Sequence, residues 1–294
     1  MRGKAKSMKF DEDILTALKA LTESGKRDLC VLLSPDEGQY DSLAQFITIP
    51  ILVVCGGYEC GKEVSRLGQI REQDREIALP CRPGSIEDLI NLSVAMALLG
   101  GTMTIGCRAV FVNMTVDPED CIIILREITE CSFEGWHAVI VSPIYPRRAV
   151  RDVLAVALEL GRMRRRPVGA MYIIGDTKNV LARSTQLFMN PFGGQPREYR
   201  DVSDPQVRDT LREYARLDGA VIIDENGLVQ AAGVHVNADT RKIPLLVEGA
   251  RHATAAAITH ETEAIAVTVS EKTGSVTVFK TGKVILTVQA GEDR

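Results

Sequence analysis

The fold class is clearest from residues 204–236, "DPQVRDTLREYARLDGAVIIDENGLVQAAGVHV". A helical pattern over 204–217 leads directly into the short apolar run "DGAVIID", which is typical of a buried strand. The tripeptide "ENG" then turns the chain into a second strand, "LVQAAGVHV". The order helix, strand, turn, strand predicts an α/β unit with a mixed sheet.

The rest of the C-terminal half contains elements of the same kinds. A helix is expected over about 146–162 and a strand over 168–175. Nearer the C-terminus, "KTG" joins "EAIAVTVSE" to "SVTVFK" as a hairpin over 263–280. Between the two hairpins lies "EGARHATAAAITHE", residues 248–261, which predicts an alanine-rich helix with a glycine and a basic pair at its start.

The N-terminal half alternates strands and helices, and this alternation favours a mainly parallel sheet. Helices are expected over 11–24 and 85–101, the second with Ser85 as its N-cap, and strands over 28–34, 49–55 and 107–114. A chain of 294 residues is longer than a domain with a single hydrophobic core usually is. The sequence therefore predicts an α/β protein of two domains, an N-terminal α/β domain over 1–125 and a C-terminal mixed-sheet α/β domain over 126–294.

Composition excludes several classes of partner. The formal net charge of -4 gives no overall field for nucleic acid or an anionic membrane. The longest uncharged run, 89–107, divides into a helix and a strand, so no membrane span is expected, and the N-terminus does not read as a signal peptide. Seven cysteines without repeated spacing argue against a disulfide framework and for a reducing, cytoplasmic compartment.

The stretch "ILVVCGGYECGKEVS", residues 51–65, resembles a phosphate-binding P-loop. Gly56, Gly61 and Lys62 match the spacing G-x-x-x-x-G-K. Glu63 stands where a P-loop has Ser or Thr, so the hydroxyl that would ligate Mg²⁺ is missing. We interpret the glycines as a strand-to-helix turn, and a P-loop-like NTPase in the N-terminal half remains the alternative.

Candidate catalytic residues gather in the C-terminal half. Asp218 stands at the start of a strand, directly after a helix, and could hold a divalent metal. Gly219 and Ala220 follow it and leave room for a ligand near the backbone. Glu271 closes the strand "AIAVTVSE" and could add a second carboxylate to the metal.

The start of the alanine-rich helix predicts an anion site. Gly249, Arg251 and His252 place free backbone N–H groups, the positive end of the helix dipole and two side-chain donors together. Phosphate is the anion expected there. Taken singly, each residue also has a structural interpretation, such as a solvated arginine or a core histidine.

Together these motifs carry a resemblance to a known family. "DGAVII" (218–223), "GARHATAA" (249–256) and "VSEKTG" (269–274) match the signatures of the diadenylate cyclase (DAC) domain, which the chain from about 126 to 294 resembles. The N-terminal half plus this domain resembles the archaeal stand-alone diadenylate cyclases. In those proteins an α/β domain of pyruvate-kinase-like type precedes the cyclase.

The resemblance implies that two ATP molecules are joined into cyclic di-AMP with release of two pyrophosphates. It implies that Asp218 ligates the catalytic metal, Mn²⁺ or Mg²⁺, and helps to activate the 3′-hydroxyl, with Glu271 assisting the metal. Arg251 and His252 would hold the triphosphate. The ATP-binding residues implied are Gly219, Ala220, Gly233, Gly249, Ala250, Arg251, His252 and Ser270. Because two ATP molecules must face each other, a homodimer of DAC domains is expected, with higher homo-oligomers allowed.

Two positions depart from the best-known bacterial pattern of the family. Ala250 and Ala253 occupy places where that pattern has Thr and a second Arg. Phosphate binding would then depend more on backbone N–H groups or on Arg241 or Lys242. This departure leaves open a nucleotide-binding sensor with a degenerate cyclase domain.

Overall fold

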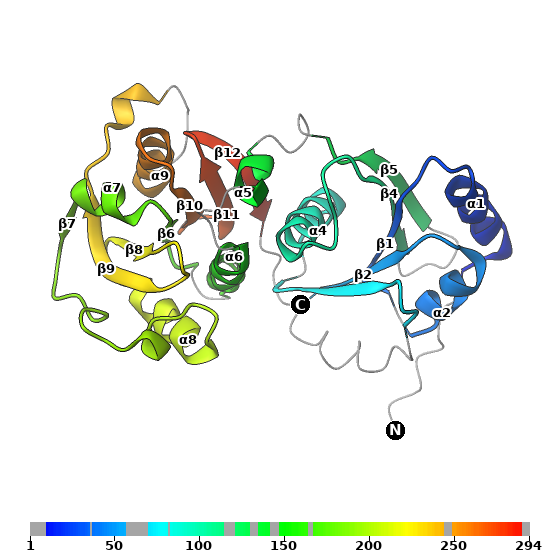
Figure 1. Cartoon of the computed structure of the whole chain (residues 1–294), viewed down its shortest axis with the longest axis horizontal. Helices are drawn as coiled ribbons and strands as arrows, with labels where there is room; N and C mark the ends of the chain where they lie inside the picture. Colours follow the sequence, from blue (N-terminus) through cyan, green and yellow to red (C-terminus); the bar gives the residue numbers. More distant parts are fainter. Residues whose placement is uncertain are drawn as a thin grey trace. The chain divides into compact units, whose positions relative to one another are not determined.

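The computed structural model describes residues 10–35, 37–56, 70–81, 83–114, 121–129, 135–141, 147–163, 167–243 and 249–289 (Figure 1). The chain divides into two compact units, Met1–Leu79 with Met96–Ser132, and Pro80–Ala95 with Phe133–Arg294. The domain boundary expected between residues 125 and 126 stays a prediction.

The first unit contains a five-stranded sheet in the order β3-β2-β1-β4-β5. The strands are β1 (Leu29–Leu33), β2 (Ile51–Gly56), β3 (Arg75–Leu79), β4 (Arg108–Met114) and β5 (Cys121–Glu127). Neighbouring strands are parallel except for the antiparallel pair β4 and β5. The expectation of a mainly parallel sheet is confirmed, and β3 and β5 are additional to the strands expected from the sequence.

Helices α1 (Glu12–Glu23) and α2 (Glu37–Phe46) pack on one face of this sheet. Their buried side chains, among them Leu18 and Leu43, form a core with alternate residues of the strands, such as Leu32 and Val53. The alternation follows because successive side chains of a strand point to opposite faces of a sheet.

Helix α4 (Ile86–Gly100) has the N-cap expected from the sequence. The Ser85 hydroxyl accepts a hydrogen bond from the backbone N–H of Asp88 at 3.1 Å. The chain leaves the helix at Gly101, whose φ of 71° is readily adopted by glycine.

A buried polar cluster ties the loop before β2 to the segment before β3. The Asp74 carboxylate accepts hydrogen bonds from the Tyr40 hydroxyl at 2.6 Å, the Ile51 N–H at 2.8 Å and Arg71 Nε at 2.8 Å. The Arg71 guanidinium also donates to the backbone oxygen of Ile47 at 2.6 Å. The hydrogen bond to Asp74 raises the pKa of Arg71, so the guanidinium stays charged.

The second unit contains a seven-stranded sheet in the order β12-β11-β10-β6-β8-β9-β7. The strands are β6 (Ala170–Ile174), β7 (Ser184–Gln186), β8 (Ala220–Ile223), β9 (Val229–Val236), β10 (Ile265–Val269), β11 (Ser275–Lys280) and β12 (Lys283–Gln289). Strands β6 and β8 are parallel and the other neighbours antiparallel, so the expected mixed sheet is confirmed.

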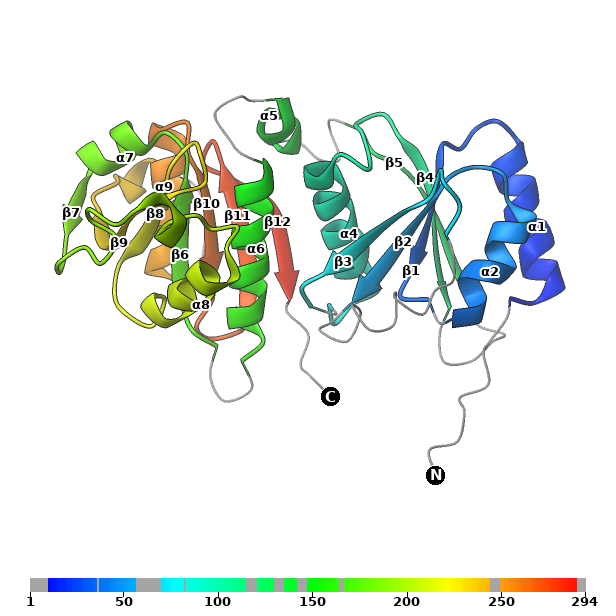
Figure 2. The same ribbon diagram turned by 60° about the horizontal axis from the view of Figure 1, so that its bottom comes forward.

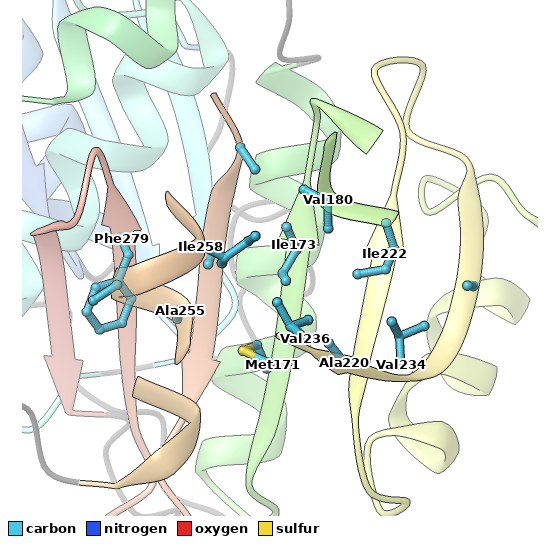
Figure 3. Packing of buried hydrophobic residues seen from close by; sticks show 14 residues of the cluster. Met171, Ile173, Val180, Ala220, Ile222, Val234, Val236, Ala255, Ile258 and Phe279 are labelled. Atoms are coloured by element: carbon cyan, nitrogen blue, oxygen red, sulfur yellow. The ribbon is translucent and has the colours of Figure 1, made fainter. Parts of the chain in front are cut away.

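Helices cover both faces of this sheet (Figure 2). Helix α9 (Ala250–Glu261) lies on one face together with the short α7 (Thr177–Ala182), and α6 (Arg147–Gly161) and α8 (Pro205–Tyr214) lie on the other. The small side chains of α9, such as Ala255, let the helix pack closely against the sheet, where Ile258 meets Ile173 and Phe279 (Figure 3).

The short helix α5 (Trp136–Val141) contacts the edge strand β12 through Trp136. Trp136 is fully buried, and its indole N–H donates to the backbone oxygen of Ile285 at 3.1 Å.

Within the described ranges no helix has both the length and the apolar character needed to span a bilayer. Four of the five cysteines in those ranges are buried.

Candidate active site

A cavity of about 830 Å³ opens in the second unit where β6 and β8 begin and β10 ends. It is lined by Pro167, Asp218, Gly249, Ala250, Arg251, His252, Val269, Ser270, Glu271 and Lys272. Most of the expected site residues therefore meet in one cavity, although they come from three distant segments of the chain.

Asp218 lies in the turn between α8 and β8 with an exposed side chain. One carboxylate oxygen, Oδ1, accepts a hydrogen bond from the backbone N–H of Gly219 at 3.0 Å. The exposed carboxylate remains accessible for a cation or a hydroxyl group.

Gly219 has a structural requirement that the sequence does not reveal. Its φ is 99°, and a Cβ there would lie 2.6 Å from the backbone nitrogen of Val234 in β9. The glycine thus lets β8 and β9 approach closely at the register shift between Ala220 and Ile222. Its contribution to ligand binding stays a prediction.

Two other expected ATP-binding residues lie within the sheet. Ala220 is fully buried in β8 as part of the core beneath α9. Gly233, in β9, has a φ of 69°, and a Cβ there would lie 2.1 Å from the Phe188 ring. Both contacts are internal, so a role for these residues in binding ATP stays a prediction.

The amino end of α9 faces the cavity. Gly249 is the N-cap with a φ of 98°, and no side chain in the described ranges caps it. The first N–H groups of a helix have no intrahelical partner, and the helix dipole makes this end positive. Ala250 adds no side-chain donor, and phosphate binding by the backbone N–H groups at this helix end stays a prediction.

Arg251 connects the three segments of the cavity. Its Nη2 lies 3.8 Å from Asp218 Oδ1, and its Nη1 lies 3.7 Å from Glu271 Oε2. The Arg251 side chain is 32% exposed, whereas the Asp218 and Glu271 side chains are 90% and 68% exposed. One cation thus holds two carboxylates together at a place open to water.

His252 lines the cavity and also contacts the core. Its ring lies edge-on to Phe279, with centroids 5.9 Å apart. Burial lowers the pKa of His252, so its imidazole is neutral at pH 7. A neutral imidazole has one N–H donor and one acceptor, which suits a hydrogen bond to phosphate rather than an ion pair.

The turn between β10 and β11 carries Ser270 and Glu271, and it confirms the expected hairpin. The backbone N–H of Gly274 donates to the Ser270 carbonyl at 2.9 Å. Gly274 has a φ of 70°, and a Cβ there would lie 2.1 Å from the carbonyl oxygen of Gly161 at the end of α6. The turn therefore packs against the end of α6, and this contact helps to hold Glu271 at the cavity.

The two carboxylates fit a hard divalent cation. Both approach the Arg251 guanidinium, each through a different terminal nitrogen. Mg²⁺ and similar ions are commonly held by one or two carboxylates together with substrate phosphates. The described ranges contain no group of three or more His, Cys, Asp or Glu residues arranged to hold a metal ion.

Some residues were not expected at the site, and others cannot be placed. Lys272, next to Glu271 in the motif "VSEKTG", adds a cation that the motif itself could have indicated. The exposed Arg241 pairs with Asp239 at 2.9 Å. Within the P-loop-like stretch, residues 57–65 lie outside the described ranges, as does the side chain of Lys242.

Comparison with known proteins connects this cavity to a family. Residues 158–284 match the DAC family model. That family is described as "DisA bacterial checkpoint controller nucleotide-binding", and the match includes Asp218, Arg251, His252 and Glu271. The matched segment runs from the end of α6 to the start of β12.

Two curated diadenylate cyclases are similar to the chain. The protein from Methanocaldococcus jannaschii is 40% identical over 143 residues, which are 47% of this chain and 45% of the relative. The protein from Haloferax volcanii is 41% identical over 143 residues, 47% of this chain and 52% of the relative. The chain thus spans about half the length of the curated relatives it matches.

Two solved structures are more distant. A double mutant of DacA from Staphylococcus aureus has 21% identity and a TM-score of 0.32, covering 47% of this chain and 84% of the other. A hypothetical membrane spanning protein from Bacillus cereus has 16% identity and a TM-score of 0.38, covering 69% of this chain and 92% of the other.

Proposed function

We propose that this chain is a diadenylate cyclase that condenses two ATP molecules into cyclic di-AMP and two pyrophosphates. The observation that carries the proposal is the convergence of Asp218, Arg251 and Glu271 in one cavity at the amino end of α9, within the segment that matches the DAC family. A cavity of about 830 Å³ is in the range that holds nucleotide-sized ligands.

The chemistry follows from the groups at the cavity. The 3′-oxygen of one ATP attacks the α-phosphorus of the other, a new P–O bond forms, and the bond to pyrophosphate breaks. The exposed Asp218 carboxylate accepts the proton of the 3′-hydroxyl. A bound Mn²⁺ or Mg²⁺ would be held by Asp218 and Glu271 and would supply neutralising charge at the phosphates.

The negative charge on the departing pyrophosphate is stabilised by three kinds of donor. Arg251 supplies a guanidinium, His252 supplies one imidazole N–H, and the amino end of α9 supplies backbone N–H groups. The free helix end compensates for Ala250 and Ala253, which contribute neither a hydroxyl nor a cation.

Each unit of this kind holds one nucleotide, so two copies must face each other. We propose a homodimer of cyclase domains, open to further assembly, in the cytoplasm. The first unit, with its mainly parallel sheet, is proposed to be the pyruvate-kinase-like domain of the archaeal type.

The test is to incubate the purified protein with ATP and Mn²⁺ and to separate the products by chromatography. Cyclic di-AMP is expected. ADP with phosphate would instead indicate an NTPase that uses the P-loop-like stretch, and bound but unchanged ATP would indicate a nucleotide sensor with a degenerate cyclase domain.

The dimer is tested by mixing subunits. Wild-type chains refolded with excess Asp218→Asn chains are expected to yield less cyclic di-AMP than dilution explains and more linear dinucleotide triphosphate. Cyclic product that tracks the number of wild-type chains linearly, despite proven subunit exchange, would contradict the face-to-face dimer.

A further inference from the structure

Gly169 lies immediately before β6, in the segment that follows Pro167 at the rim of the cavity. A Cβ built at this position would lie 2.6 Å from Arg251 Nη1 and 3.3 Å from Arg251 Cζ. It would also lie 3.1 Å from the Cβ of Glu271. The missing side chain of Gly169 is therefore the space that the Arg251 guanidinium occupies.

We infer that Gly169 is a positioning residue, which sets the place of the Arg251 guanidinium between Asp218 and Glu271. The inference rests on the proposed function for its kinetic consequence. Its structural part rests on the contacts of Gly169 alone.

The backbone does not require glycine here. The φ of Gly169 lies outside the left-handed region, so alanine could adopt the same conformation without strain. However, the Arg251 guanidinium already occupies the space that an alanine methyl group would need. The atom it would meet first is the far end of a flexible arginine side chain, which can move, and the Glu271 Cβ at 3.1 Å would have to shift by only a few tenths of an ångström.

Gly169→Ala should therefore displace a functional group while leaving the fold intact. A methyl group at this position pushes Nη1 away from its 3.7 Å contact with Glu271. Since the guanidinium is rigid and planar, Nη2 loses its place 3.8 Å from Asp218 at the same time. Misplacing a catalytic group by about 1 Å can lower a rate by on the order of 100-fold.

The matched control is Gly193→Ala. Gly193 lies in the same unit with a φ outside the left-handed region, and a Cβ there would lie 3.4 Å from the nearest atom, the Asn190 oxygen, which is an ordinary contact. Both variants add one methyl group, but only the one at Gly169 meets Arg251.

The experiment measures three quantities for wild type and both variants: the unfolding temperature, kcat and KM for ATP, and the ¹⁵N–¹H resonance of Arg251 Nε without nucleotide. The Arg251 resonance is assigned from its disappearance in Arg251→Lys. For Gly169→Ala we expect an unchanged unfolding temperature, a shifted Arg251 resonance and a kcat/KM reduced by about 10- to 100-fold. Gly193→Ala should match wild type in all three.

A double mutant separates positioning from a general structural effect. Lysine lacks the Nη1 atom that the methyl group would meet, so adding Gly169→Ala to Arg251→Lys should reduce kcat/KM by less than twofold further. Equal losses in both backgrounds, or an unmoved Arg251 resonance in Gly169→Ala, would overturn the inference. A shifted resonance in a protein whose wild type makes no cyclic di-AMP would refute the proposed function and leave the positioning role standing.

Discussion

Replacement of Arg251 by alanine should separate stability from activity. Its two ion pairs span 3.7 and 3.8 Å, with partners that are 68% and 90% exposed. Two charges about 4 Å apart interact by about 1 kcal/mol in water, and exposed pairs typically contribute ~0.2–1 kcal/mol. Arg251→Ala should therefore lower the free energy of unfolding by about 1 kcal/mol or less, which shifts Tm by about 2–4 °C.

The effect on synthesis should be much larger. Loss of a donor that stabilises transition-state charge typically lowers kcat by about 10²–10³. The assay measures cyclic di-AMP formation and thermal unfolding on the same preparation. The control is Arg183→Ala, because Arg183 Nε pairs with Glu261 Oε2 at 3.5 Å with 40% of the arginine side chain exposed. A comparable loss of activity in both variants, or near-normal turnover in Arg251→Ala, would refute this reasoning.

Three further outcomes are expected. Asp218→Asn should abolish cyclic di-AMP synthesis and weaken Mn²⁺ binding, which electron paramagnetic resonance measures. Its Tm should stay close to wild type, because the amide keeps the volume of the carboxylate but not its charge. Normal turnover in this variant would remove Asp218 from the mechanism. Asp74→Ala should lower the free energy of unfolding of the first unit, measured in urea, by about 3–5 kcal/mol, because it leaves the Arg71 charge without its fully buried partner. A decrease in the free energy of unfolding of less than about 1 kcal/mol would contradict this prediction. The hydrogen bonds from Arg108 lower the pKa of Asp28 from 3.8 to about 2, so this carboxylate contributes stability above pH 3.8 that is lost as the pH falls towards 2. Asp28→Asn should therefore reduce the change in the free energy of unfolding between these two pH values. An unchanged pH dependence in the variant would argue against the Asp28–Arg108 pair.

Sequence patterns predicted the elements whose signals are local. Helix α9 follows from a glycine N-cap and an alanine run, and α4 from the Ser85 cap. Strands β3 and β5 at the edges of the first sheet carry exposed and half-buried residues, and their place is decided by the strand beside them. Pairing between distant segments leaves little trace in a short window of sequence.

The same distinction between local signals and long-range contacts applies to the residues of the candidate active site. The types of residue needed at the cavity could be predicted from the motifs around Asp218, Arg251 and Glu271. Their pairing could not, because the distances depend on how three segments meet. The glycines illustrate the limit best: Gly219 is required by the approach of β9 and Gly169 by a guanidinium from α9, and neither contact is visible in the neighbouring residues.

The strand order of the second sheet makes this cavity depend on pairing between distant parts of the chain. Strand β10 lies antiparallel beside β6, with Ile265 opposite Ile174, and its end carries Glu271 to within 3.7 Å of Arg251. Contacts between residues so far apart in sequence form slowly, because a long loop must close before they are made. A nascent or truncated chain that ends before β10 therefore carries the Asp-Gly-Ala and Arg-His motifs without a site, which confines any chemistry to the completed sheet.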